Sequence, residues 1–318
     1  MLTFFVSVLL HSATSVAVPV PCAEVVSRLE AELEGLMEIV REQHRYIQEL
    51  HRSQTTQLQG VPNSFMGTGN IYRDCSEIFE DGNVASGLYV IRPDGVPSAL
   101  TVYCDMSDGG GWTVFQRRRD GTESFDRAWV EYKQGFGDLF SAGGEFWLGN
   151  DPLHHLTSQG QYELRINMED FENNQRFAEY KNFKVDGEKD AYQLHVGEYS
   201  GNAGDAFGPS VLKFSTFDHP TLTSDEDAQC IGHNRAGWWF SRCGAGNLNG
   251  HYYSGPYQAQ TDDGVVWYTW RGWWYSIKSV VMMVRATDLQ QANQQQQQQQ
   301  QQQRGSEQGL PRVIKNQN

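Results

Sequence analysis

The five cysteines are the residues of this chain with the clearest chemistry. They are Cys22, Cys75, Cys104, Cys230 and Cys243. No two form a C-x-x-C pair, so a zinc site is not expected. In a secreted chain four of them suit two internal bridges, and the odd one suits a bond to another chain. Spacing alone permits a 30-residue loop from Cys75 to Cys104 and a 14-residue loop from Cys230 to Cys243, but it does not fix the pairing.

The histidines offer little for catalysis. His154 and His155 are adjacent and so point in different directions on a helix, while His195 lies in a strand pattern. None has the H-E-x-x-H or G-x-S-x-G context that metal or serine chemistry requires. We therefore expect that the chain is not an enzyme.

The N-terminus indicates the compartment. Residues 1–17 contain the apolar run Phe4–Leu10 and small residues at Ser15–Ala17 that suit cleavage. The usual early Lys or Arg is absent, but the segment still predicts a signal peptide and a secreted, extracellular protein. No apolar run reaches the roughly 18 residues of a spanning helix, so membrane insertion is not expected.

Residues 22–58 predict a short coiled coil. They contain no proline, and apolar residues recur at spacings of three and four: Val26, Leu29, Leu33, Leu36, Val40, Ile47 and Leu50. This heptad register places Cys22 on the seam, where it can form an interchain disulfide with its copy. The prediction is a disulfide-linked dimer or higher oligomer. The alternative is a single amphipathic helix packed on the downstream domain, but so narrow a stripe favours the oligomer.

The rest of the chain divides into three parts by composition. Residues 59–70 are a Gly/Pro/Asn/Ser linker, residues 71–289 have globular composition, and residues 290–318 form a Gln-rich tail. The tail contains ten consecutive glutamines at 294–303 and almost nothing to bury, which predicts disorder. The role of this tract is not indicated by the sequence.

The part from 71 to 289 predicts an α+β fold with many loops. Strand patterns lie at 99–104, 112–116, 162–167, 192–196 and 279–285, and short helices are expected at 124–135 and 151–158. The region 200–265 reads almost entirely as loop. A chain with 12% aromatic residues, 32 glycines and a net charge of −14 suits a loop-rich fold pinned by large rings, not a nucleic-acid surface.

Several strings in this part resemble the fibrinogen C-terminal globular domain. They are DCSEIFEDG at 74–82, VYCDMSDGGGWTVFQRR at 102–118, GEFWLGN at 144–150, GWWFSRC at 237–243, NLNGHYYSG at 247–255 and WYTWRGWWYSIKSVVMMVR at 267–285. The motifs are in order over about 220 residues. The resemblance implies a small N-terminal bridged subdomain, a central twisted antiparallel sheet and a loop-rich ligand subdomain. It also implies the pairs Cys75–Cys104 and Cys230–Cys243, and a cis peptide at Arg242–Cys243.

The calcium loop of that family is altered here. The string FSTFDHPTLTSDEDAQC keeps a first carboxylate at Asp218, but Pro220 occupies the second aspartate position and has no side-chain oxygen. Asp225 and Asp227 in the longer loop are candidates to restore the oxygen ligands that Ca²⁺ needs. The alternative is a solvated acidic turn. Calcium is thus a possible cofactor with a degenerate loop, and no other cofactor is expected.

The ligand surface also departs from the family pattern. Relatives that bind acetylated sugars or fibrin knobs have a His where this chain has Gly244. The candidate ligand residues are Arg242, Tyr252, Tyr253, Tyr257, Asp262 and Asp263. Tyr side chains beside Gly and Asn suit a protein-binding surface, although rings packed under long loops are the alternative for each of them.

The function that the resemblance implies is that of a secreted, oligomeric ligand for a cell-surface protein receptor. The chain is most similar to family members with a short coiled coil before one globe, and this similarity implies a liver-type factor, or hepatokine, with growth-regulatory, metabolic or immune-inhibitory activity. One alternative is a ficolin-type pattern-recognition lectin, disfavoured by Gly244 and by the absence of a collagen stalk. The other is a matrix or clot-associated structural protein, disfavoured by the shortness of the coiled coil.

Overall fold

The computed structural model describes residues 71–208, 212–221, 235–240, 246–259 and 262–288, together with Ala31, Leu33 and Gly35. The chain divides into two compact units, Met1–Ser64 and Phe65–Asn318. Ala31, Leu33 and Gly35 are helical. The rest of the predicted coiled coil lies outside the described residues, as do the predicted signal peptide, linker and tail, so these stay predictions. Within the described part of the chain, no helix combines the length and apolarity needed to cross a bilayer.

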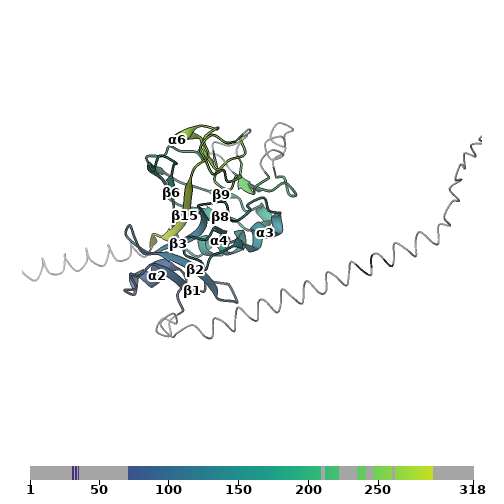
Figure 1. Cartoon of the computed structure of the whole chain (residues 1–318). Coiled ribbons are helices and arrows are strands. Elements are labelled where there is room, and N and C mark those ends of the chain that lie inside the picture. The colour runs from purple at the N-terminus through teal and green to yellow at the C-terminus, as the bar shows by residue number, and fades with distance from the viewer. Residues whose placement is uncertain are drawn as a thin grey trace, which may run out of the picture. The chain divides into compact units, whose positions relative to one another are not determined.

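A nine-stranded antiparallel sheet forms the centre of the globe (Figure 1). Its main path runs β1 (Gly87–Ile91), β2 (Leu100–Asp105), β3 (Trp112–Arg118), β15 (Ser279–Ala286), β6 (Tyr162–Glu169), β7 (Gln175–Tyr180) and β10 (Tyr199–Gly201). The short strands β4 (Phe136–Gly137) and β5 (Phe146–Trp147) branch from β3. The last strand, β15, pairs with both β3 and β6. The C-terminal strand of the domain therefore lies in the middle of the sheet. Every second residue of β6 is buried, which is the period of a half-buried strand.

Short helices and two-stranded pairs surround this sheet. The helices are α2 (Cys75–Glu80), α3 (Trp129–Gln134), α4 (Asn150–Ser158), α6 (Tyr268–Arg271) and a 3₁₀ turn at Glu188–Asp190. The pairs are β8 (Lys184–Val185) with β9 (Leu194–His195), β11 (Phe214–Ser215) with β12 (Trp238–Trp239), and β13 (Gly246–Asn247) with β14 (Val266–Trp267). In Figure 1, α2 and α6 lie at opposite ends of the globe.

Buried indoles hold the loop-rich half in place. Trp239 Nε1 donates to the Tyr192 carbonyl at 2.8 Å, and Trp267 Nε1 donates to the Gly204 carbonyl at 3.0 Å. Both rings are fully buried in the core. Because a buried indole N–H must find an acceptor, each ring fixes both its own pair of strands and the loop that supplies the carbonyl.

The disulfide Cys75–Cys104 joins α2 to β2. Both cysteines are buried, and their Cα atoms lie 5.5 Å apart. Asp74 caps α2 because its carboxylate accepts the Glu77 N–H at 3.0 Å. The bridge that the resemblance implied at the domain entrance is therefore present.

The structure supports the predicted fold class, but its elements differ from the expected ones in several places. Strands β1, β7 and β10 were not expected, and the short strands β11, β12 and β13 lie in the region 200–265 that was expected to be almost entirely loop. The helix expected at 124–135 begins only at Trp129. Side chains bond the backbone before it: Ser124 Oγ accepts the Asp126 N–H, and Tyr132 Oη donates to the Phe125 carbonyl. The strand expected at 192–196 shortens to Leu194–His195, because Tyr192 has a left-handed φ of 46° that interrupts the extended backbone.

Candidate functional site

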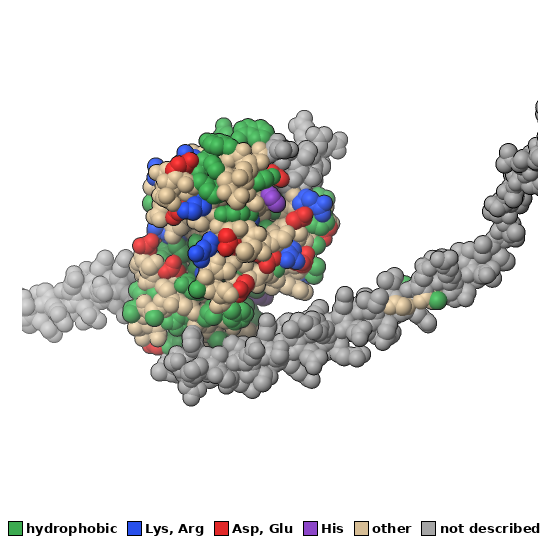
Figure 2. Space-filling model, in the orientation of Figure 1, with side chains coloured by type: hydrophobic (Ala, Val, Ile, Leu, Met, Phe, Trp, Pro, Cys, Tyr) green, Lys and Arg blue, Asp and Glu red, His purple; other side chains and the backbone are tan. Residues whose placement is uncertain are grey.

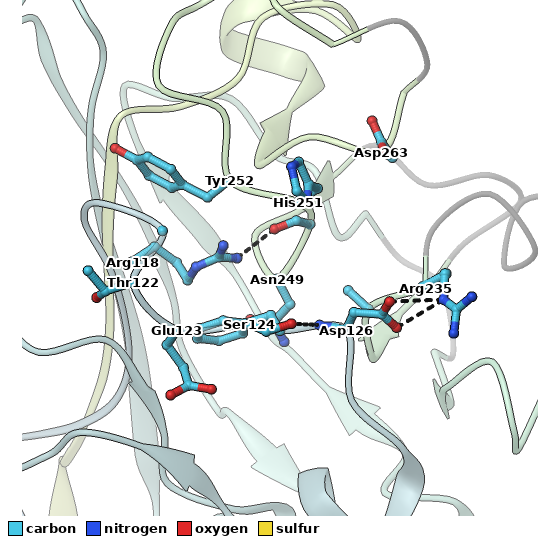
Figure 3. Close-up of a pocket in the computed structure, with 14 residues that line it drawn as sticks. Arg118, Thr122, Glu123, Ser124, Asp126, Arg235, Asn249, His251, Tyr252 and Asp263 are labelled. Atoms are coloured by element: carbon cyan, nitrogen blue, oxygen red, sulfur yellow. Dashed lines mark hydrogen bonds and ion pairs between the residues drawn. The ribbon is translucent and has the colours of Figure 1, made fainter.

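A cavity of about 320 Å³ lies between the loop after β3 and the loop-rich half of the globe (Figure 3). The residues that line it come from five separate stretches of the chain: Arg118, Gly121–Asp126, Arg235–Ala236, Asn249–Tyr252 and Asp263. Its walls therefore depend on tertiary contacts rather than on any one motif.

Glu145, fully buried beside the cavity, organises the loop that forms one wall. Its carboxylate accepts the Arg119 N–H at 2.7 Å, the Asp120 N–H at 3.3 Å and the Glu123 N–H at 3.0 Å. A single anion thus satisfies three backbone donors of a tight loop, which fixes that loop against the sheet.

Arg118 is the buried cation of the site. Its Nε lies 3.6 Å from Glu145, and its Nη1 donates to the carbonyls of Leu248 at 3.2 Å and Gly250 at 2.8 Å. Figure 3 shows the guanidinium directed at the Gly250 carbonyl. The guanidinium also lies 3.9 Å from the Phe125 ring centroid. Burial lowers the pKa of Arg118, and Glu145 opposes that change.

The mouth of the cavity carries a second ion pair. Arg235 Nε lies 2.9 Å from Asp126, and its guanidinium lies 5.0 Å from the Phe217 ring. On the other side Tyr253 Oη donates to Asp263 at 2.9 Å. Burial and this bond raise the pKa of Tyr253 to about 12, so its hydroxyl keeps its proton at neutral pH.

This arrangement suits binding rather than catalysis. Arg118 and Glu145 are bonded to backbone groups, Arg235 is paired with Asp126, and Asp263 accepts the Tyr253 hydroxyl, so the charged side chains at the cavity are fixed in place. In the described ranges no three His, Cys, Asp or Glu side chains are grouped so that they could hold a metal ion.

The structure brings together two of the predicted ligand residues. Tyr252 and Asp263 line the cavity, and Tyr253 supports Asp263. The Tyr252 hydroxyl lies 2.5 Å from the Arg119 carbonyl and 2.9 Å from that of Lys278. Asp262 does not line the cavity.

Two further predicted ligand residues lie away from this cavity or cannot be placed. Tyr257 packs instead against Tyr275, with ring centroids 5.2 Å apart. Arg242 lies outside the described residues, so its predicted role stays a prediction.

The sequence reasoning missed Arg118, Asp126 and Arg235. A signal existed for the first of them. Arg118 follows the strand expected at 112–116 and lies in phase with Trp112 and Val114, the side chains expected to be buried. A charged side chain buried at such a position must be paired. Asp126 and Arg235 are 109 positions apart, so no local sequence pattern predicts their ion pair.

Asp218 is the one predicted calcium donor among the described residues, and its carboxylate is bonded to protein groups. The Asp218 carboxylate accepts the Trp129 N–H at 3.0 Å and the Thr216 hydroxyl at 2.7 Å, so it caps helix α3 from another segment. The His219 ring lies 4.1 Å from the Trp129 ring and reinforces this contact. Asp225 and Asp227 lie outside the described residues, so calcium coordination there stays a prediction.

The remaining cysteine predictions also lie outside the described residues. These are the bridge Cys230–Cys243, the cis peptide before Cys243 and the interchain bond of Cys22. They stay predictions.

Comparison with known proteins places the chain in a family. The model described as "Fibrinogen beta and gamma chains, C-terminal globular domain" matches residues 71–287. Fibrinogen-like protein 1 of Bos taurus and of Homo sapiens are each 49% identical to this chain over 283 residues, which is 84% of this chain and 90% of theirs.

Solved structures agree with this placement. The fibrinogen-like globe domain of human ANGPTL2 matches with a TM-score of 0.63 and 42% identity, covering 68% of this chain and 99% of that one. A lamprey fibrin D-dimer complexed with the peptide Gly-His-Arg-Pro-amide matches with a TM-score of 0.64 and 33% identity, covering 83% and 90%. This chain therefore belongs to the fibrinogen C-terminal domain family, whose members are ligand and structural proteins rather than enzymes.

Proposed function

We propose that this chain is a secreted, oligomeric ligand that binds a cell-surface protein receptor, with growth-regulatory, metabolic or immune-inhibitory signalling as the result. The observation that supports this most is the 49% identity to fibrinogen-like protein 1 across 84% of the chain, a span longer than the globe alone. Angiopoietin-4 of Bos taurus is a further relative, 38% identical over 253 residues.

The geometry of the globe supports a binding role. Loops that carry polar side chains are fixed by buried anchors such as Glu145 and Trp239, so little conformational freedom is lost when a partner binds. Oligomerisation through Cys22 would let several globes act together and raise the avidity of weak sites.

Two measurements test the proposal. Secreted full-length chain is compared with Cys22→Ser by non-reducing electrophoresis. A covalent dimer or larger species that is lost in the variant is expected, and monomers in both samples would overturn the disulfide-linked form.

The second measurement is binding of the labelled full chain to cells that each display one receptor ectodomain. Saturable binding to at least one protein receptor is expected. Retention on an N-acetylglucosamine resin that free sugar abolishes, with no protein receptor bound, would favour a lectin instead.

A further inference from the structure

An exposed group of aromatic side chains lies around α6, apart from the cavity. We call it the α6 aromatic patch, and it consists of Tyr257, Tyr268, Trp270, Trp273 and Trp274. Tyr257 is 69% exposed, Trp274 57% and Tyr268 46%, while Trp270 and Trp273 are half-buried. Figure 2 shows hydrophobic side chains gathered over α6 at the top of the globe.

One ring contact joins two members of the patch, and a second joins a member to the buried ring beneath it. The Tyr268 and Trp273 centroids lie 4.7 Å apart. Tyr257 lies 5.2 Å from Tyr275, the residue that follows Trp274. The backbone brings the same two segments together, because the Ser276 N–H donates to the Pro256 carbonyl at 2.8 Å. The patch therefore comes from two segments that a backbone hydrogen bond and the Tyr257–Tyr275 contact hold side by side.

Arg271 packs on one ring of the patch, Trp270, and on the buried Tyr275 that contacts Tyr257. Its guanidinium lies 4.8 Å from the Tyr275 ring and 5.5 Å from the Trp270 ring. It is ion-paired with the buried Asp170 and, at 3.0 Å, with Glu172, which also accepts the Tyr275 hydroxyl at 2.6 Å. Rings fixed in this way lose little rotamer freedom when a partner covers them.

Phe140 and Phe217 are also exposed, and Trp129 is partly exposed, but most other tryptophans of the globe are buried. Trp112, Trp147, Trp238, Trp239 and Trp267 are all nearly or fully buried. Large aromatic surface left in contact with water in one place is typical of an interaction site, and Trp and Tyr are the residues most enriched at the energetic centres of interfaces.

The charge around the patch indicates what covers it. One guanidinium, Arg271, faces two carboxylates, Asp170 and Glu172, and the Glu172 side chain is 52% exposed. Residues 71–288 as a whole carry 18 Lys and Arg against 31 Asp and Glu. An acidic globe repels anionic lipid surfaces and attracts basic groups, and indole and phenol faces attract Arg and Lys directly.

From these observations we infer that the α6 aromatic patch is the docking surface for a partner protein whose contact face is apolar at its centre and basic at its rim. This inference rests on the proposed receptor-ligand function and names the surface that carries it. Neither a membrane nor a second copy of this acidic chain supplies the same charge complement.

The test uses the full chain with Tyr257→Ser and Trp274→Ser together, on the same cells that each display one receptor ectodomain. The control is Val84→Ser, which removes an equally exposed apolar side chain (71%) beside α2, at the other end of the globe. Both variants replace exposed side chains, so melting temperatures close to that of the wild type establish that they fold. We expect the patch variant to bind about thirty-fold more weakly, with the control unchanged and with binding weakened by added salt.

Each other outcome has a definite meaning. Equal receptor binding by the patch variant would overturn the docking surface while leaving the proposed function in place. Binding of the wild type to no receptor would overturn both. Wild-type binding to vesicles of phosphatidylserine and phosphatidylcholine that the patch variant loses would show that the patch contacts lipid instead.

Discussion

Glu145 is the anchor of the cavity, and replacing it with Gln removes the charge while keeping the shape of the side chain. The carboxylate faces the buried Arg118 at 3.6 Å and accepts three backbone N–H groups. A Gln at this position retains one oxygen for Arg119 and Asp120. Its amide group, however, faces the Glu123 N–H and leaves that donor unbonded.

The magnitude follows from two contributions. Breaking a buried ion pair by removing one partner costs about 3–5 kcal/mol, and an unbonded buried donor costs about 1–3 kcal/mol. Arg118 keeps two carbonyl acceptors and the Phe125 face, so the two contributions overlap. We expect a loss of about 4 kcal/mol in the free energy of unfolding, or roughly 10 °C in Tm for a domain of this size.

The assay is urea unfolding followed by tryptophan fluorescence under non-reducing conditions. Arg118→Met with Glu145→Gln should be less destabilised than Glu145→Gln alone, because no buried charge is left without a partner. Glu198→Gln, an exposed carboxylate paired with Lys181, serves as the control and should unfold as the wild type does. A loss below about 1 kcal/mol for Glu145→Gln, or a double variant less stable than the single one, would refute this account of the site.

Three further predictions concern other parts of the globe. Asp218→Ala removes the hydrogen-bond acceptor at the start of α3 and should lower the free energy of unfolding by about 1 kcal/mol. The loss should be the same in EDTA and in millimolar calcium. If calcium raises the Tm of the wild type and Asp218→Ala abolishes that rise, a metal binds at this loop instead. Cys75→Ser with Cys104→Ser opens a 30-residue loop and should cost about 3–4 kcal/mol in urea unfolding, so unchanged stability would contradict a structural role for the bridge. Burial raises the pKa of Asp170, but hydrogen bonds from Arg271 and Asn174 outweigh it and hold that pKa below its usual value. The stability that Asp170 contributes is therefore present above about pH 4 and lost as the pH falls through its folded pKa. The difference in free energy of unfolding between the wild type and Arg271→Gln should therefore shrink from pH 6 to pH 3. A constant difference over that range would show that the Asp170–Arg271 pair does not act electrostatically.

Strand prediction succeeded where burial follows the sequence period. The patterns at 99–104, 112–116, 162–167 and 279–285 correspond to β2, β3, β6 and β15. It failed where tertiary contacts replace local preference. Residues 124–128 read as helix but are held by side-chain bonds and by Glu145, which lies 22 positions after Glu123.

The cavity illustrates the same limit at the candidate site. Tyr252 and Asp263 were predicted because the resemblance to the family implies a ligand surface in this region, where aromatic and acidic side chains are present. Their neighbours Arg118 and Arg235 were not, because they reach the cavity only through the pairing of β3 with distant strands and loops.

The sequence by itself determined the family, the main strands of the sheet and the cysteines available for bridging, because these depend on local composition, period and motif order. Only the tertiary structure decided which rings of the string WYTWRGWWY face water and which charges meet at the cavity. Neighbouring aromatic residues are indistinguishable by composition. Each is buried or exposed according to the segments, often more than 100 positions away, that the packed core brings against it.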